Sequence, residues 1–204
     1  MNKTKILSFL KIFCLVIFSV LAIEINYFHR EFLWDKLILL YIHNYSNSWL
    51  NKLAPILTNF GGLKLILFFS FFISLFLFIK KQKRLLTYLI TSIFTSAIVN
   101  FIIKIFFQRP RPNLWESFYT QPSDFSFPSG HAMGSISLAL TLLIIFWGSR
   151  WTLLLTILAL FYILTIAWTR LYLGVHYPSD ILGGWLLGIF WTTLITLLLN
   201  PRKF

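Results

Sequence analysis

The feature that most constrains this chain is a series of apolar stretches that are about as long as a membrane-spanning helix. Such a helix needs roughly 20 consecutive apolar residues to cross the hydrocarbon core of a bilayer. Residues 85–103, 132–149, 151–169 and 181–200 contain no Asp, Glu, Lys or Arg at all. With 58% hydrophobic and only 12% charged residues, the chain has the composition of an integral membrane protein.

Two further apolar stretches carry one or two charges each. Residues 62–79 include Lys64 near one end, from where its side chain can reach the headgroups, and residues 6–28 include Lys11 and Glu24. We therefore predict one all-α domain over residues 1–204, an integral membrane bundle of six transmembrane helices. The spans are expected at about residues 6–28, 62–79, 85–107, 131–148, 151–168 and 181–199.

The region before the second span allows two further predictions. Lys3 and Lys5 precede the first apolar stretch, so this stretch could also be a secretory signal, which would leave the other five spans unchanged. Residues 30–59 mix apolar residues with polar ones such as Asp35 and His43, and are too polar to span. We expect interfacial helices there, between the first and second spans, with their apolar sides at the acyl boundary.

The distribution of basic residues predicts the topology. Six spans place four basic groups on one side: Lys3 with Lys5, residues 80–84, Arg150, and Arg202 with Lys203. Cytoplasmic loops are enriched in Lys and Arg, so we expect both termini in the cytoplasm. The net charge of +12 is then explained by topology and anionic lipid, and no nucleic acid partner is expected.

Four basic residues fall on the opposite side and need another explanation: Lys104, Arg109, Arg111 and Arg170. Lys104 and Arg111 are seven residues apart, roughly on one helical face, although Pro110 is expected to end the helix before Arg111. The two cations could converge on one anion. Anchoring at the membrane interface is the alternative.

The same loop ends in Pro128-Ser129-Gly130-His131, at the start of the fourth span. A helix N-terminus offers free backbone N–H groups, glycine allows a close approach, and serine adds a hydroxyl, so this segment could hold an anion beside a histidine. A simple turn that caps the helix would use the same residues.

The second loop on this side contains His176 and, four residues later, Asp180, with Pro178 suited to the first turn of the sixth helix. From there the carboxylate can reach one nitrogen of His176 and leave the other nitrogen free as a nucleophile. Taken alone, such a pair is more often structural than catalytic.

Together, residues 104–112, 128–131 and 169–180 resemble the three signature motifs of the type 2 phosphatidic acid phosphatase superfamily. The first motif, a Lys with six residues before Arg-Pro, appears as Lys104, Arg111 and Pro112, whereas Arg109-Pro110 has the wrong spacing. The second is complete at residues 128–131, and the third has Thr169 in place of a Ser before Arg170. The resemblance covers the chain from the third span onward.

The resemblance implies a role for each matching residue and requires neither cofactor nor metal. His176 would be the nucleophile that forms a phosphohistidine, Asp180 would orient it, and His131 would protonate the leaving group. The phosphoryl oxygens would be bound by Lys104, Arg111, Ser129, Gly130 and Arg170. Three cations and backbone N–H groups suit phosphoryl transfer, which depends on charge stabilisation and in-line positioning.

The predicted function is hydrolysis of a membrane lipid phosphate or diphosphate at the outer leaflet. Candidate substrates in the family are polyprenyl diphosphate, phosphatidic acid and phosphatidylglycerophosphate, and a bacterial inner membrane is the expected location. Two alternatives remain open: a lipid phosphotransferase that uses an acceptor other than water, and a non-catalytic lipid transporter or scaffold. A scaffold would not need six convergent polar residues, which argues against it; these are Lys104, Arg111, His131, Arg170, His176 and Asp180.

Overall fold

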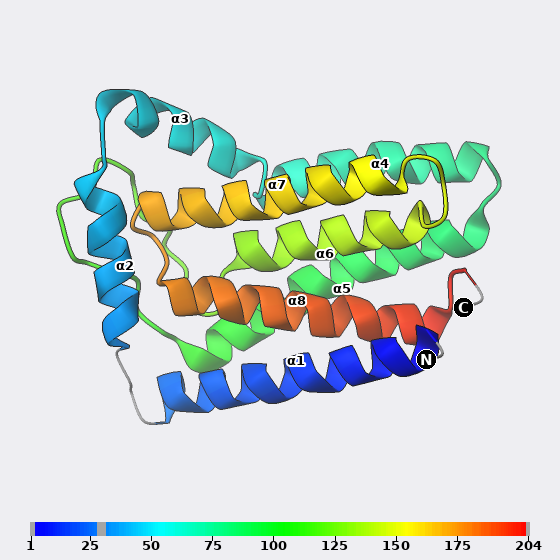
Figure 1. The fold of residues 1–204 in the computed structure, drawn as a ribbon, viewed down its shortest axis with the longest axis horizontal. Coiled ribbons are helices and arrows are strands. Elements are labelled where there is room, and N and C mark those ends of the chain that lie inside the picture. The colour runs from blue at the N-terminus through cyan, green and yellow to red at the C-terminus, as the bar shows by residue number, and fades with distance from the viewer. Residues whose placement is uncertain (1–2, 28–31, 203–204) are drawn as a thin grey trace.

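The structure, a computed structural model, describes residues 3–27 and 32–202, and these residues form eight helices and no strands (Figure 1). The expected all-α class is therefore confirmed. Phe28, Arg30, Glu31 and Lys203, which the sequence analysis assigned to the first span, the surface segment and the basic C-terminus, lie outside the described residues. The helices are α1 (Lys3–Asn26), α2 (Leu33–Asn44), α3 (Ser48–Asn59), α4 (Leu63–Ile79), α5 (Lys83–Phe107), α6 (Gly130–Ile145), α7 (Thr152–Tyr172) and α8 (Pro178–Leu199).

The long helices form a bundle that is covered at one end. In Figure 1, α1 and α4 to α8 lie alongside one another, whereas α2 and α3 lie at the end opposite to the two termini. The C-terminal end of α5, the N-terminal end of α6, the C-terminal end of α7 and the N-terminal end of α8 all reach the end that carries α2 and α3 (Figure 1). The three sequence motifs are therefore brought to one end of the bundle.

The described residues contain four helices that are individually long and apolar enough to cross a membrane: Thr4–Asn26, α5, α7 and α8. Helices α3 and α4 meet the same criterion only as a pair, bent by 48°, and α6 is shorter with 16 residues. The chain is an integral membrane protein, but the count of six crossings stays a prediction. Helix α6 ends before the predicted residue 148 because the chain turns at Gly148, which has φ of 74°.

The outer surface of the bundle is apolar, and its interior is tied together by small and polar residues. Leu153 and Phe161 are 73% and 70% exposed on α7, which suits a surface in contact with lipid. Inside, a methyl group added at Gly184 of α8 would lie 2.7 Å from the backbone oxygen of Ser129, so this glycine allows α8 to pack closely against the start of α6.

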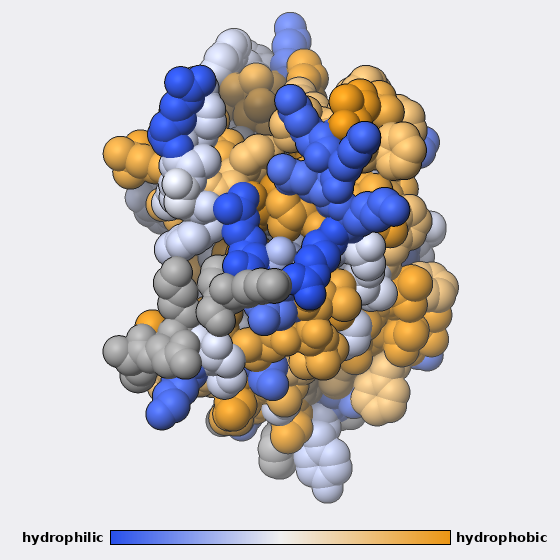
Figure 2. Space-filling view, turned by 90° about the vertical axis from the view of Figure 1, so that its right-hand side faces the viewer, coloured by the Kyte–Doolittle hydropathy of each residue, from blue (hydrophilic) through white to orange (hydrophobic). Residues whose placement is uncertain are grey.

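Charged side chains gather at the end that carries the termini. Figure 2 views this end, where hydrophilic groups lie among apolar ones. Lys80 and Lys81 follow α4, Lys83 and Arg84 begin α5, Arg150 precedes α7, and all five are exposed. The two ends of the bundle therefore differ: basic residues are solvent-exposed at one, and the motif residues are largely buried at the other.

Candidate active site

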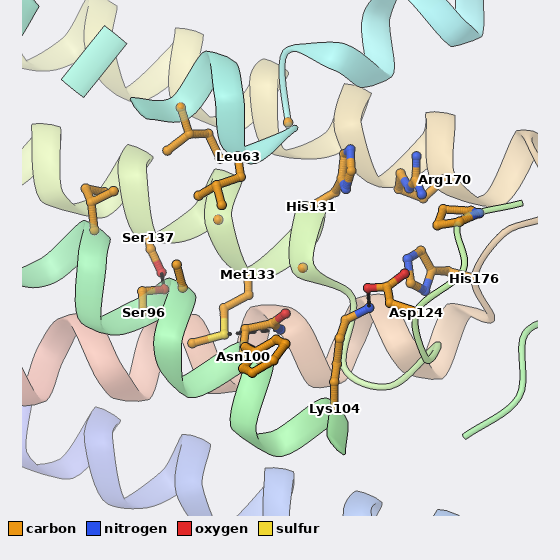
Figure 3. A pocket seen from close by; sticks show the side chains of 18 of the residues that line it. Leu63, Ser96, Asn100, Lys104, Asp124, His131, Met133, Ser137, Arg170 and His176 are labelled. Carbon is orange, nitrogen blue, oxygen red and sulfur yellow. Dashed lines mark hydrogen bonds and ion pairs between the residues drawn. The ribbon is translucent and has the colours of Figure 1, made fainter. Parts of the chain in front are cut away.

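A cavity of about 390 Å³ lies where the three motifs meet (Figure 3). Most of the predicted site residues line it: Lys104, Arg111, Gly130, His131, Arg170 and His176. Ser129 and Asp180 are fully buried beside these residues and do not line the cavity. The fold therefore places side chains from α5, α6, α7 and both connecting loops around one space.

Lys104 and Arg111 converge on the carboxylate of Asp124. Helix α5 ends at Phe107, and Gln108 turns the chain in the left-handed conformation with φ of 46°, so Arg111 lies in the loop. The Lys104 ammonium donates to Asp124 Oδ2 at 2.5 Å, and Arg111 donates to Asp124 Oδ1. Two motif cations thus share one anionic partner.

Asp124 is ionised near neutral pH and binds both of these cations. Burial would raise the pKa of Asp124, but the hydrogen bonds and charges of Lys104 and Arg111 outweigh it and lower the pKa to about 2. Its side chain is nevertheless 54% exposed, whereas that of Lys104 is 8% exposed. A half-exposed carboxylate therefore balances two cations whose side chains are nearly buried.

The second motif forms the start of α6. Ser129 is the N-cap residue, and its hydroxyl accepts the N–H of Ala132 at 3.4 Å, so this side chain caps the helix and does not line the cavity. Gly130 fits closely, since an added methyl group would lie 3.0 Å from Oδ1 of Asn100. Gly130 and His131 line the cavity and place the positive end of the helix dipole beside it.

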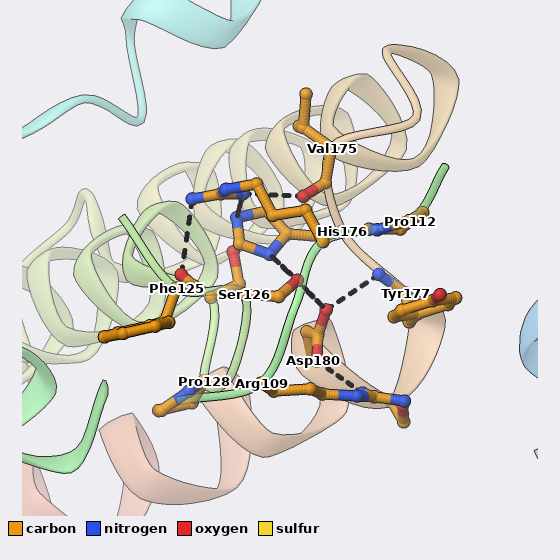
Figure 4. A network of polar contacts seen from close by, with 12 residues as sticks. Arg109, Pro112, Phe125, Ser126, Pro128, Val175, His176, Tyr177 and Asp180 are labelled. Atoms are coloured by element: carbon orange, nitrogen blue, oxygen red, sulfur yellow. Dashed lines mark hydrogen bonds and ion pairs between the residues drawn. The ribbon is translucent and has the colours of Figure 1, made fainter. Parts of the chain in front are cut away.

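His176 is held on one side by Asp180. The Nδ1 atom lies 3.5 Å from Asp180 Oδ2 and 3.3 Å from Ser126 Oγ, inside the network drawn in Figure 4. The Nε2 atom lies 3.2 Å from a terminal nitrogen of Arg111. A guanidinium can only donate, so Nε2 must accept this bond, and the imidazole proton is then on Nδ1, facing Asp180.

The surroundings keep the His176 imidazole neutral. The ring is buried, and burial lowers the pKa of His176 well below its usual range, with the positive charges of Arg170, Arg111 and Lys104 adding to the effect. A neutral imidazole with an unprotonated Nε2 at a cavity is the form that can attack an electrophile.

Arg170 supplies a third cation from the last turn of α7. Its side chain is 1% exposed, and one terminal nitrogen donates to Thr58 Oγ1 of α3 at 2.9 Å. Its Nε has no hydrogen-bond partner within the described part of the chain. A buried donor without an acceptor is rare, and beside a cavity it is consistent with a bound anion as partner.

Residues 85–204 match the family model of the PAP2 superfamily. The chain belongs to the PAP2 superfamily. It is 31% identical over 119 residues to an undecaprenyl-diphosphatase of Sulfolobus acidocaldarius, which covers 56% of this chain and 55% of that protein. It is 30% identical over 149 residues to phosphatidylglycerophosphatase B of Bacillus subtilis, covering 69% of this chain and 71% of that one.

A solved structure has the same fold over nearly the whole chain. The crystal structure of a transmembrane PAP2 type phosphatidylglycerolphosphate phosphatase from Bacillus subtilis superposes with a TM-score of 0.80 at 25% identity, covering 91% of this chain and 94% of that one. By sequence, the chain spans about half the length of the first curated relatives it matches. The family resemblance inferred from the motifs is confirmed.

The structure adds site residues of this PAP2 protein that sequence reasoning did not select. Asp124 and Ser126 contact motif residues, and Thr58 holds Arg170. Arg109 donates to Asp180, and Asp35 accepts the backbone N–H of the neighbouring Ser179. One signal was present in the sequence: Arg109 is one of the four basic residues on this side that topology leaves unexplained. The pairing of Asp35 with Arg109 had no sequence signal.

The position of Asp124 leads to a prediction about anion binding. Asp124→Asn removes the charge that pairs with Lys104 and Arg111, so an anion such as vanadate, a mimic of the five-coordinate phosphoryl group, should inhibit more strongly. We expect an inhibition constant lower by about 2- to 5-fold, the range for an exposed ion pair worth up to about 1 kcal/mol. Glu116→Gln, an exposed loop carboxylate, is the matched control. Weaker inhibition would mean that Asp124 holds the cations ready for the anion.

Proposed function

We propose that this protein hydrolyses a lipid phosphate or diphosphate at the outer leaflet through a phosphohistidine intermediate. The substrate classes that fit are polyprenyl diphosphates, phosphatidic acid and phosphatidylglycerophosphate. The observation that carries the proposal is one cavity in which Lys104, Arg111 and Arg170 surround a neutral, oriented His176. The names of the PAP2 relatives, which are lipid phosphatases, agree with it.

The other part of the cavity supports a lipid as the substrate. Beyond the cations it is lined by apolar side chains of α4, α5 and α6, among them Leu63, Ile66, Ala97, Phe101 and Met133. Leu63 and Phe101 are also 54% and 64% exposed at the outer surface. A hydrocarbon chain could therefore extend from the phosphate site to the lipid-facing surface between α4 and α5 without entering water.

In the first step, Nε2 of His176 attacks the phosphorus atom, and the bond from phosphorus to the leaving oxygen breaks. The lipid alcohol, or a lipid monophosphate in the case of a diphosphate, leaves with a proton donated by His131. Lys104, Arg111, Arg170 and the N–H groups at the start of α6 stabilise the charge on the phosphoryl oxygens. The bound phosphoryl group itself favours a protonated His131, because it brings negative charge next to the ring.

In the second step, water attacks the phosphohistidine. The phosphorus–nitrogen bond breaks, His131 accepts a proton from the water, and inorganic phosphate leaves while His176 returns to its neutral form. Asp180 stabilises the positive charge that develops on the His176 ring in both steps through its contact with Nδ1. No step calls for a metal ion.

The orientation in a bacterial inner membrane follows from charge. Basic residues are exposed at the end with the termini (Figure 2), and the helix ends that carry the three motifs lie toward the other end (Figure 1). We infer six crossings, by α1 and α4 to α8, with α2 and α3 as interfacial helices at the outer surface and both termini in the cytoplasm.

Reporter fusions test the orientation. A reporter placed after Arg150 should give a cytoplasmic signal, and one placed in the loop at Asn113 should give an extracytoplasmic signal, because Lys and Arg are retained on the cytoplasmic side. A cytoplasmic signal from the Asn113 fusion would contradict the outer-leaflet site.

Phosphate release tests the function. The purified protein should release phosphate from members of a panel of polyprenyl diphosphates and glycerophospholipid phosphates, in the presence of a strong chelator. His176→Ala should abolish release, because no other described residue has its nucleophilic position. Release that stops in chelator and returns with magnesium would contradict the mechanism. Product formed only when an alcohol acceptor is added would favour phosphotransfer instead of hydrolysis.

The two histidines can be separated by their dependence on the leaving group. His131→Ala should slow phosphoenzyme formation by about 10²- to 10⁴-fold with a lipid alkoxide, which needs a proton to leave. The defect should shrink with an activated phenol, which leaves without one. Rapid quench and mapping of acid-labile phosphate to the peptide with His176 measure this directly. Phosphate mapped to His131 would exchange the two roles.

A further inference from the structure

Arg109 lies two residues before Arg111 and has a different environment. Its guanidinium does not line the cavity but points to the opposite side of Asp180 (Figure 4). One terminal nitrogen donates to Asp180 Oδ1 at 2.5 Å and to Ser179 Oγ at 2.7 Å. The side chain is 9% exposed and lies over the ring of Tyr177 at 4.4 Å. Arg109 is therefore placed to act on Asp180 and not on a substrate in the cavity.

Asp35 of α2 completes this arrangement from the other end of the sequence. Its Oδ2 accepts from Arg109 at 3.1 Å and from Ser179 Oγ at 2.5 Å, while its Oδ1 accepts the backbone N–H of Ser179 at 2.8 Å. It thus satisfies a free N–H group in the first turn of α8. Burial raises the pKa of Asp35, and the contacts with Ser179 and Arg109 oppose that effect.

Both oxygens of Asp180 are held by these contacts. Oδ1 binds Arg109, while Oδ2 accepts from Ser126 Oγ at 2.5 Å and from the backbone N–H of Tyr177 at 2.8 Å. The same Oδ2 faces Nδ1 of His176. With both oxygens bound, rotation of the carboxylate is restricted, and the oxygen that faces the His176 ring belongs to a network that includes Arg109.

We propose that Arg109, held by Asp35 of α2, is a positioning residue that fixes Asp180 and through it directs Nε2 of His176 at the phosphoryl group. The inference rests on the proposed function for its kinetic consequences. Without Arg109, the buried carboxylates of Asp35 and Asp180 would lose the cation they share, and Asp180 would lose the partner of one oxygen. Asp35 gives α2 a part in catalysis without any contact to substrate.

A double-mutant cycle tests the proposal. Arg109→Ala should lower kcat by about 10- to 100-fold, by analogy with the outer partners that orient metal-binding histidines. KM should change little, because Arg109 does not line the cavity. In an Asp180→Asn background the same change should cost less than about 3-fold, because both substitutions remove one function. An equal loss in both backgrounds, or a raised KM with kcat intact, would overturn the proposal.

Conservative variants and controls distinguish a loss of positioning from a loss of folding. Arg109→Lys keeps the positive charge, so its kcat should be higher than that of Arg109→Ala. It should remain below the wild-type kcat, because one ammonium cannot bind Asp180, Ser179 and Asp35 together. Asp35→Asn should lower kcat less than Arg109→Ala does. Arg150→Ala, at an exposed arginine at the other end of the bundle, should leave kcat unchanged. If Arg109→Ala does not fold, the cycle is run with Arg109→Lys, and an equal loss in both backgrounds again counts against the proposal.

A measurement without turnover separates this inference from the proposed function. The chain has four histidines, so ¹⁵N-histidine spectra can resolve His176, assigned by its loss in His176→Gln. Arg109→Ala should shift its ring nitrogen signals in the same direction as Asp180→Asn, and Arg150→Ala should not. Unchanged signals in Arg109→Ala would overturn the positioning role. A wild-type protein without phosphatase activity would contradict the proposed function, yet the same shifts would still support the positioning role.

Discussion

Charge balance in an apolar surrounding is the constraint on which the rest of this structure depends. Four basic side chains lie buried or nearly buried at one end of the bundle: Lys104, Arg109, Arg111 and Arg170. Removing one partner of a buried ion pair typically costs about 3–5 kcal/mol, because the other charge is left without compensation. Among the described residues, Asp35, Asp124 and Asp180 supply the compensating carboxylates at this end. The cations outnumber them, so an anionic substrate would complete the balance.

The carboxylates divide the site into two parts with different tasks. Asp35 and Asp180 are fully buried and bind Arg109. Together these three residues form a fixed group of ion pairs behind His176. Asp124 is half-exposed on a loop and binds the cations that face the cavity. A phosphoryl group could displace the half-exposed carboxylate of Asp124, because Asp124 can turn to solvent. The buried carboxylates of Asp35 and Asp180 cannot exchange with solvent in this way. The fixed contacts thus lie behind His176, and the exchangeable contact faces the cavity in which we propose that substrate binds.

Much of the fold and of the site could be predicted because the signals are local. Apolar length and charge indicated the helices, and motif spacing indicated which residues line the cavity. The helix boundaries were predicted less accurately. Helix α7 continues to Tyr172, past the expected end at residue 168, and so places Arg170 on a helix. Asn100, Thr58 and Ser126 were not selected, since a polar residue in or near an apolar helix looks the same whether it faces lipid, a neighbour or a catalytic group.

The sequence by itself determined the helical class, the membrane setting and the three motifs, because each depends on residues that are close in the chain. Only the tertiary structure decided which carboxylate balances which cation. Asp35 and Arg109 are 74 positions apart, and Thr58 and Arg170 are 112 apart. Such pairs form because helices α2 and α3 close over the end of the bundle, and buried charges there must find whatever partner the packing brings near.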